Sequence, residues 1–288
     1  MKSNYTKGII SIILSALGFA GMAFFVKLSG DVPILQKAVF RNMVTLVYSF
    51  VLIAHAHVGL GLSPKHRLPM LGRCLFGTIG FLANFLAIEH LNLGDASILQ
   101  KMAPFFAIVM SIFILNEKPN KLAIICIFTA LIGAAFVVKP TSGLVSVPAL
   151  IGLLGGFCGG TAYTFVRRLG TDGVNGNVII FYFSISSVLA LLPFVLLNFQ
   201  PMTLQQTVLL LLAGLCAVVG QVFVTKAYSY APAKEISVFD YTQVIFAALL
   251  GIIFLSEVPD LYSIIGYVII IATALIKWNF DRKEQKTA

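Results

Sequence analysis

The sequence predicts an all-α integral membrane protein of ten transmembrane helices, arranged as two inverted five-helix repeats. Three observations support this fold class: an apolar composition, a series of apolar runs of about 20 residues, and a repeat at an offset of 140 residues. Of the 288 residues, 59% are hydrophobic and 11% are charged, and the mean hydropathy is +0.97. This composition lies outside the range of soluble domains and leaves no segment for a soluble catalytic domain.

The ten helices are expected between the Gly, Pro, Asn and charged residues that interrupt the apolar runs. Their ranges are 8–28, 33–54, 69–90, 95–116, 121–138, 147–167, 176–197, 204–228, 234–255 and 260–278. Lys2 and Lys7 precede the first run as they would in a signal peptide. That run is too long for a signal peptide and further spans follow, so we expect the first helix to be retained.

The distribution of Lys and Arg predicts the orientation in the membrane. With the N-terminus in the cytoplasm, most basic residues fall on the cytoplasmic side, and only Lys27 and Lys139 fall in outer loops. We therefore expect a multi-pass protein of the cell membrane with both termini cytoplasmic. The net charge of +9 does not indicate nucleic acid, because the basic residues are spread over short loops without a dense aromatic patch.

Cysteine and histidine give no sign of a metal or cofactor. The four cysteines lie in separate apolar runs without CxxC spacing, so we expect reduced packing residues. They are Cys74, Cys126, Cys158 and Cys216. His55 and His57 form an HxH pair without a further ligand cluster, so no metal site and no cofactor are expected.

The repeat is most specific where each half ends. The sequence "FILNEKPN" at 113–120 aligns with "IFLSEVPD" at 253–260, which places Glu117 over Glu257. Because each half holds an odd number of spans, the second half enters the bilayer upside down relative to the first. Inverted repeats are typical of secondary transporters, which alternate access to a site near the middle of the membrane.

The segments that close the two halves also carry a family resemblance. They read "LNLGDASILQKMAPFFAIVMSIFILNEKPN" at 91–120 and "APAKEISVFDYTQVIFAALLGIIFLSEVPD" at 231–260. A small-residue loop, an apolar helix and a final Leu-x-Glu make the chain resemble, over essentially its whole length, the EamA-type branch of the drug/metabolite transporter (DMT) superfamily. The resemblance implies a cavity lined by helices 1 to 4 and 6 to 9. Helices 5 and 10 would lie at the periphery, where a homodimer contact is an open alternative.

This organisation predicts two domains, 1–139 and 140–288, which together form one membrane domain. Overlapping GxxxG pairs in "GLLGGFCGGTAY" at 152–163 predict a close helix contact for the sixth span.

Ionisable side chains inside spans are costly and usually face a cavity or a partner. Arg41 and Lys101 are candidates for binding an anionic group such as a carboxylate. Two alternatives stay open: Lys37 snorkels to the outer headgroups, and Arg41 pairs with a backbone carbonyl or with an outer acid such as Asp95. Pro104 is expected to kink its helix and to free a carbonyl.

The second half differs from the first at the equivalent positions. Lys101 aligns with Tyr241, and Gln100 with Asp240. Asp240 is a candidate for proton coupling, for contact with a substrate amine, or for a structural pair with Lys226 or Lys234. Pro104 aligns with Val244, so the two halves are expected to bend differently.

The candidate residues form two groups. Substrate contacts are hypothesised at Arg41, Asn84, Gln100, Lys101, Tyr163, Tyr182, Tyr241 and Gln243. Coupling or gating is hypothesised at Lys37, Pro104, Glu117, Asp240 and Glu257. For the tyrosines and amides, interhelical packing is the alternative.

The sequence therefore predicts a secondary active transporter of a small metabolite, an amino acid or another carboxylate-bearing compound, with the lipid bilayer as its surroundings. A proton-coupled exporter of organic cations or drugs, using Asp240, is the main alternative, followed by a membrane protein without a transport function. An enzyme is not expected, because the sequence contains no HExxH, no GxSxG and no paired carboxylates.

Overall fold

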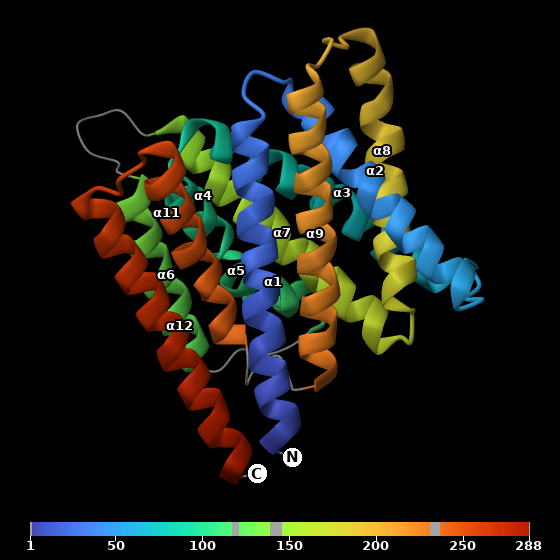
Figure 1. Cartoon of the computed structure of the whole chain (residues 1–288). Helices are drawn as coiled ribbons and strands as arrows, with labels where there is room; N and C mark the ends of the chain where they lie inside the picture. The colour runs from blue at the N-terminus through green and yellow to red at the C-terminus, as the bar shows by residue number, and fades with distance from the viewer. Residues whose placement is uncertain (1, 117–120, 139–145, 231–236, 288) are drawn as a thin grey trace.

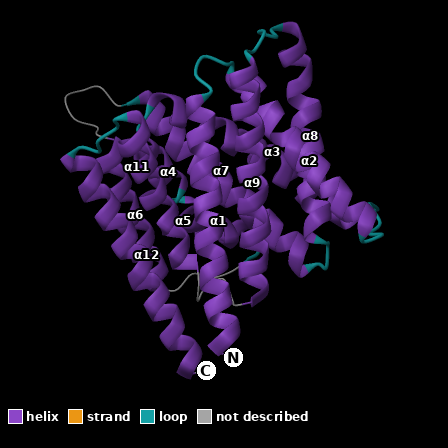
Figure 2. Ribbon diagram, in the orientation of Figure 1, coloured by secondary structure: helices purple, strands orange, loops and turns teal. Residues whose placement is uncertain are grey.

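The structure, a computed structural model, describes residues 2–116, 121–138, 146–230 and 237–287. These residues form a bundle of helices, and no strand occurs among them (Figures 1 and 2). The helices of the first half are α1 (Lys2–Leu28), α2 (Ile34–His55), α3 (Pro64–His90), α4 (Leu93–Gln100), α5 (Ala103–Ile114) and α6 (Lys121–Val138). Those of the second half are α7 (Val147–Thr171), α8 (Gly176–Leu197), α9 (Leu204–Tyr230), the 3-10 helix η1 (Ser237–Tyr241), α11 (Thr242–Leu255) and α12 (Leu261–Thr287).

The ten expected spans are present among the described residues. Eight segments are long and apolar enough to cross a membrane, and two shorter apolar segments, Ile124–Val137 and Phe239–Leu255, complete the set. The bilayer selects helices because a helix satisfies its own backbone hydrogen bonds where no water is available. Large apolar side chains such as Phe128, 64% exposed on α6, and Ile276, 59% exposed on α12, face outward, as expected where lipid is the solvent.

One predicted helix boundary is wrong in a way that matters for the site. The third helix was expected to begin at residue 69, but α3 begins at Pro64 and Pro69 lies inside it. Proline is common in the first turn of a helix, where its missing N–H costs nothing, and here Pro64 holds that place instead. Arg73 therefore lies more than two turns inside α3 rather than near its beginning.

The fourth and ninth spans are both interrupted. α4 and α5 are separated by a turn at Lys101 and Met102, and η1 passes into α11 at Tyr241 and Thr242. The two breaks differ in form, as expected: a turn separates α4 from α5, whereas a 3-10 helix precedes α11. They occur at equivalent positions of the repeat, Lys101 and Tyr241. The second break occurs without a proline at Val244, so proline alone does not cause it.

The packing of the helices shows the pseudo-twofold relation between the halves. α1 packs on α9, and α3 packs on α7, which is the same contact with the two halves exchanged. The pairs α2 with α8 and α6 with α12 each join equivalent helices, and the contact of α4 with α11 joins the two equivalent broken spans, the fourth and the ninth. The predicted domain boundary at 139/140 lies outside the described residues.

The chain begins and ends at the same end of the bundle (Figure 1), as an even number of spans requires. We call this the termini end and the opposite one the far end. The loops between α1 and α2 and between α8 and α9 lie at the far end (Figure 1).

Glycines on α7 allow the broken fourth span to approach closely. A Cβ added to Gly156 would lie 2.6 Å from the carbonyl oxygen of Leu99, and one added to Gly160 would lie 2.4 Å from that of Ala103. Both distances are too short for a side chain. The predicted close contact of this helix is therefore made with α4 and α5, on either side of the break, and also with α3, where Gly155 faces the backbone of Gly80 and Asn84.

Candidate functional site

The two helix breaks meet at an ion pair. The Lys101 Nζ atom donates to Asp240 Oδ2 at 2.5 Å, and the Tyr241 hydroxyl donates to the Lys101 carbonyl oxygen at 3.0 Å. Lys101 is only 9% exposed and Tyr241 only 6%. Lys101 of the first repeat therefore binds the second repeat twice: its ammonium contacts Asp240, and its carbonyl accepts from Tyr241, the residue at the equivalent position of the repeat.

The break itself explains why the carbonyl of Lys101 is available. In a continuous helix this oxygen would accept from the N–H of Phe105, but that N–H donates to Met102 O at 3.0 Å. Pro104, in the first turn of α5, has no N–H to donate. In a continuous helix an N–H at position 104 would serve the carbonyl of Gln100, so the free carbonyl of Lys101 results from the turn at Lys101 and Met102 and not from the proline alone. A tyrosine hydroxyl of the other repeat satisfies it.

Two arginines lie near this junction, each beside an aromatic ring. The Cζ atom of Arg41, on α2, is 5.8 Å from the ring centre of Phe81, and that of Arg73, on α3, is 4.0 Å from the ring centre of Phe183. The two rings pack edge to face with centres 5.9 Å apart. Arg41, Phe81, Phe183 and Arg73 therefore form one continuous series of contacts, which we call the arginine cluster.

The arginine cluster contains no carboxylate. Among the residues that the structure describes, neither guanidinium has an acidic oxygen within 4.0 Å. Arg41 Nη1 donates to Asn42 Oδ1 at 2.7 Å, a neutral partner. The Nε atoms of Arg41 and Arg73 are both buried without a hydrogen-bond partner. Unsatisfied cationic donors in this surrounding are costly and would be stabilised by an anion.

Tyr163 indicates open space next to the arginine cluster. Its side chain, on α7, is 58% exposed, yet it interacts electrostatically with Arg41, Arg73 and Asp240. These three residues belong to α2, α3 and η1, so Tyr163 faces inward between helices rather than outward to lipid. We infer a solvent-accessible space bounded by this tyrosine and the two guanidiniums.

The far end is tied by contacts between the repeats. The Lys27 ammonium pairs with Glu257 and donates to the carbonyl of Leu91, while the N–H of Leu93 donates to Glu257 Oε2 at 2.8 Å. Glu257 therefore caps the beginning of α4 as well as binding the end of α1. Lys27 was expected in an outer loop but lies in the last turn of α1.

Two further contacts hold the beginning of α2. The side-chain amide of Gln36 donates to the carbonyl of Gln200 at 2.9 Å and accepts from its N–H at 3.2 Å. Lys37 pairs with Glu89 at 2.5 Å and is 1% exposed. The snorkelling alternative is therefore wrong for Lys37, because its side chain is buried and pairs with Glu89 at the end of α3.

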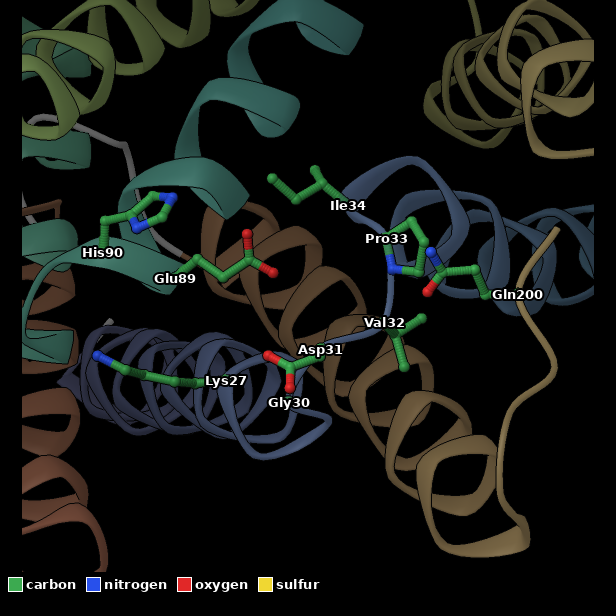
Figure 3. Close-up of a pocket in the computed structure, with 9 residues that line it drawn as sticks. All are labelled: Lys27, Gly30, Asp31, Val32, Pro33, Ile34, Glu89, His90 and Gln200. Atoms are coloured by element: carbon green, nitrogen blue, oxygen red, sulfur yellow. The ribbon is translucent and has the colours of Figure 1, made fainter. Parts of the chain in front are cut away.

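A pocket of about 600 Å³ lies beside these contacts at the far end (Figure 3). Its lining combines charged, polar and apolar residues: Lys27, Gly30, Asp31, Val32, Pro33, Ile34, Glu89, His90 and Gln200. The pocket is separate from the arginine cluster, since the two share no residue.

The remaining candidates do not gather in one place. Asn84 and Gln243 are 3% and 2% exposed, so they are packed between helices. Tyr182 donates to the carbonyl of Leu60 at 2.8 Å and ties α8 to the loop before α3. Gln100 is half-buried at the end of α4. Glu117 lies outside the described residues.

The structure tests some of the partners considered for Asp240 and Arg41. Asp240 pairs with Lys101, while Lys226 lies over the ring of Phe223; Lys234 is outside the described residues. Asp95 accepts from the Tyr267 hydroxyl at 2.7 Å, and no Arg41–Asp95 ion pair occurs.

Arg73 and Glu89 were missed from sequence. Arg73 was assigned to the cytoplasmic side because its helix was expected to begin at residue 69. Glu89 lies at the end of a span, where a charge is ordinary. A basic residue inside the range 69–90 was a usable signal for Arg73, whereas nothing in the sequence pointed to Glu89. Within the described ranges, no group of three or more His, Cys, Asp or Glu side chains is placed to hold a metal ion.

Comparison with known proteins places this geometry in a family. The model of the EamA-like transporter family matches residues 6–139 and 147–277, which correspond to the two halves of the bundle. A solved crystal structure shares the fold with a TM-score of 0.65 at 16% identity, covering 97% of this chain and 99% of that one.

Several transporters align with this chain over almost its whole length. The pseudopaline exporter CntI of Pseudomonas aeruginosa (strain UCBPP-PA14) is 33% identical over 272 residues, which span 93% of this chain and 94% of that protein. An uncharacterized transporter of Helicobacter pylori (strain J99 / ATCC 700824) is 27% identical and covers 96% of both chains. Solute carrier family 35 member G1 of Homo sapiens is 24% identical, over 96% of this chain and 81% of its own length. The chain therefore belongs to the EamA-like transporter family, and it is a membrane transporter rather than an enzyme.

Proposed function

We propose that this protein is a secondary active transporter that moves a small carboxylate-bearing metabolite, such as an amino acid, across the cytoplasmic membrane by alternating access. The observation that carries this proposal is the arginine cluster: two guanidiniums with buried, unpartnered Nε atoms and no carboxylate within 4.0 Å among the described residues. Arginine binds carboxylates in a bidentate manner, which suits it to hold such a substrate.

The two ends of the bundle support alternating access. At the far end, Glu257 and Gln200 of the second repeat bind Lys27 and Gln36 of the first. Beside the arginine cluster, Tyr163 on α7 is 58% exposed. This combination supports a state that is closed at the far end and open at the termini end.

The orientation follows from the distribution of basic residues. With both termini cytoplasmic, this state opens the arginine cluster to the cytoplasm. The name of the Pseudomonas aeruginosa relative, a pseudopaline exporter, supports export as the direction. A homodimer stays a prediction.

The alternative, a proton-coupled exporter of organic cations using Asp240, has less support. The Asp240 carboxylate already holds the Lys101 ammonium at 2.5 Å. The two unpaired guanidiniums nearby would repel a cationic substrate. Lys101, hypothesised as a substrate contact, would reach a substrate only if it shared or left Asp240.

Transport by purified protein in liposomes tests the proposal. Uptake would be measured for labelled amino acids, organic acids and organic cations, with wild type and the variants Arg41→Gln and Arg73→Gln. We expect uptake of carboxylate compounds and its loss by tenfold or more in each variant, on the order of 1.4 kcal/mol of binding free energy. Arg168→Gln serves as a matched control, because Arg168 is exposed and its guanidinium donates to a backbone carbonyl, that of Ile114.

The opposite result is equally defined. Uptake restricted to organic cations, abolished by Asp240→Asn and unchanged in both arginine variants, would show that the anion site does not exist. Loading the compound inside or outside the liposomes, with the orientation of the protein determined by protease accessibility, tests the direction.

A further inference from the structure

We propose that the substrate carries two carboxylates, one bound by Arg41 and the other by Arg73. This inference rests on the carboxylate transport proposed above and adds the number of anionic groups. It concerns the same cluster, but it predicts in addition that a dicarboxylate binds more tightly than its monoamide.

The first argument is the charge of the cluster. Arg41, Arg73 and Lys101 each carry one positive charge, and Asp240 carries one negative charge. The Asp240 carboxylate lies 2.5 Å from the Lys101 ammonium and offsets it. Two positive charges are left, one on each arginine, and among the described residues no acidic oxygen lies within 4.0 Å of either.

The second argument concerns burial. Arg41 is 6% exposed, and the Nε atoms of both arginines are buried without a partner. An uncompensated charge away from water is strongly unfavourable unless an opposite charge reaches it. Alternating access requires a state in which the substrate is enclosed, and in that state water no longer solvates the cluster. A substrate with one carboxylate would leave one guanidinium without a counter-charge at that step.

The third argument is the separation of the two guanidiniums. Arg41 contacts the Phe81 ring at 5.8 Å, Arg73 contacts the Phe183 ring at 4.0 Å, and the ring centres are 5.9 Å apart. Each guanidinium therefore borders its own ring, and the two cations are also near enough to interact electrostatically. A ligand with two carboxylates, one for each guanidinium, would offset this repulsion at both places.

The cluster also offers a place for the apolar chain that would join the two carboxylates. Phe81 is partly exposed beside Arg41, whereas Phe183 is only 6% exposed and backs it edge to face, and Tyr163 adds an exposed ring with a hydroxyl on α7. Small-molecule sites commonly combine apolar walls with a few polar groups that fix orientation. The arrangement thus suits a short dicarboxylate or an acidic amino acid.

The test compares acids with their monoamides, which have nearly the same size and one charge less. The probes are glutamate against glutamine, succinate against succinamate, and glutarate against glutaramate. Binding to purified protein in detergent would be measured by calorimetry, and uptake would be measured in liposomes. We expect each dicarboxylate that binds to do so at least about tenfold more tightly than its monoamide.

The arginine variants then locate the effect. In Arg41→Gln and in Arg73→Gln, affinity for the dicarboxylate should fall to about that of the monoamide, and the ratio between the two should approach one. Arg168→Gln should keep the ratio of the wild type. Arg73→Lys keeps the charge and should retain a ratio above one if Arg73→Gln fails to fold.

The outcomes separate the two proposals. If wild type binds acid and monoamide equally, or binds only monocarboxylates, the inference of two carboxylates is wrong while the proposed function stands. If no carboxylate compound binds or is transported, both fail. Neither result depends on a variant, because the comparison in wild type decides.

Discussion

Tyr241 donates its hydroxyl to the carbonyl oxygen of Lys101 at 3.0 Å, and the two residues hold the same position in the two repeats. The contact therefore lies close to the pseudo-twofold axis that relates the two repeats. Nearby, Lys101 also binds Asp240. One residue of the first repeat is thus held by two consecutive residues of the second, through its side chain and its backbone.

Replacing Tyr241 by phenylalanine should lower stability. The change leaves a buried carbonyl of the helix break without its donor, which costs about 1–3 kcal/mol. Thermal unfolding in detergent, followed by tryptophan fluorescence or circular dichroism, measures the effect. Tyr262→Phe is the control, because Tyr262 is 54% exposed on α12. Equal midpoints for the two variants would show that the contact does not stabilise the break.

Replacing Glu257 by glutamine should loosen the far end. Glutamine keeps an oxygen for the N–H of Leu93 and removes the charge that holds Lys27. A loss of about 1–2 kcal/mol would change the ratio of closed to open molecules about 5- to 30-fold.

A cysteine reporter measures this opening. Val32 is 4% exposed and lines the far-end pocket, so Val32→Cys in a background without the four native cysteines should react slowly with an impermeant maleimide. Adding Glu257→Gln to this protein should speed the reaction. Adding Glu89→Gln instead is the control, because it removes a neighbouring carboxylate charge and leaves the Lys27–Glu257 pair in place. An unchanged rate with Glu257→Gln would exclude a gating role for that ion pair.

The Lys37–Glu89 pair should show a strong double-mutant coupling. Lys37 is 1% exposed, while the Glu89 side chain is 25% exposed, so the cost of losing Glu89 alone should lie between about 1 kcal/mol for an exposed pair and about 3–5 kcal/mol for a buried one. Lys37→Met combined with Glu89→Gln should recover part of the stability lost in Glu89→Gln. Thermal unfolding of the four proteins of the cycle measures this, and additive losses would contradict it.

Two neighbouring glycines of α7 should respond oppositely to alanine. In Gly160→Ala the new Cβ would lie 2.4 Å from the carbonyl of Ala103, so α7 and α5 must move apart. In Gly159→Ala the nearest atom is at 3.6 Å, and the gain in helix propensity is about 1 kcal/mol. We expect lower thermal stability and slower transport for Gly160→Ala only. Similar behaviour of both variants would mean that close packing at this glycine is unimportant.

Much of the architecture was readable without a structure. The ten spans were predicted because lipid demands long apolar helices, and the inverted repeat was visible because "FILNEKPN" and "IFLSEVPD" match at a fixed offset. Arg41 and Lys101 were singled out for the same reason, since a charge inside an apolar run is conspicuous. Helix ends were predicted less well. Because the third helix was expected to begin at residue 69, Arg73 was placed near the membrane surface and was not considered as a site residue.

The sequence by itself thus determined the class of fold, the duplication and the presence of cations within the membrane. Only the tertiary structure decided how those cations are compensated. Lys101 finds Asp240 at a separation of 139 positions, and Glu257 joins Lys27 from the other repeat, while Arg41 and Arg73 meet phenyl rings and no described carboxylate. The physical reason is that a charged residue within an apolar run is costly in lipid and can be recognised in the sequence itself. The residue that compensates the charge depends on which helix faces pack together, and that is a property of the tertiary structure.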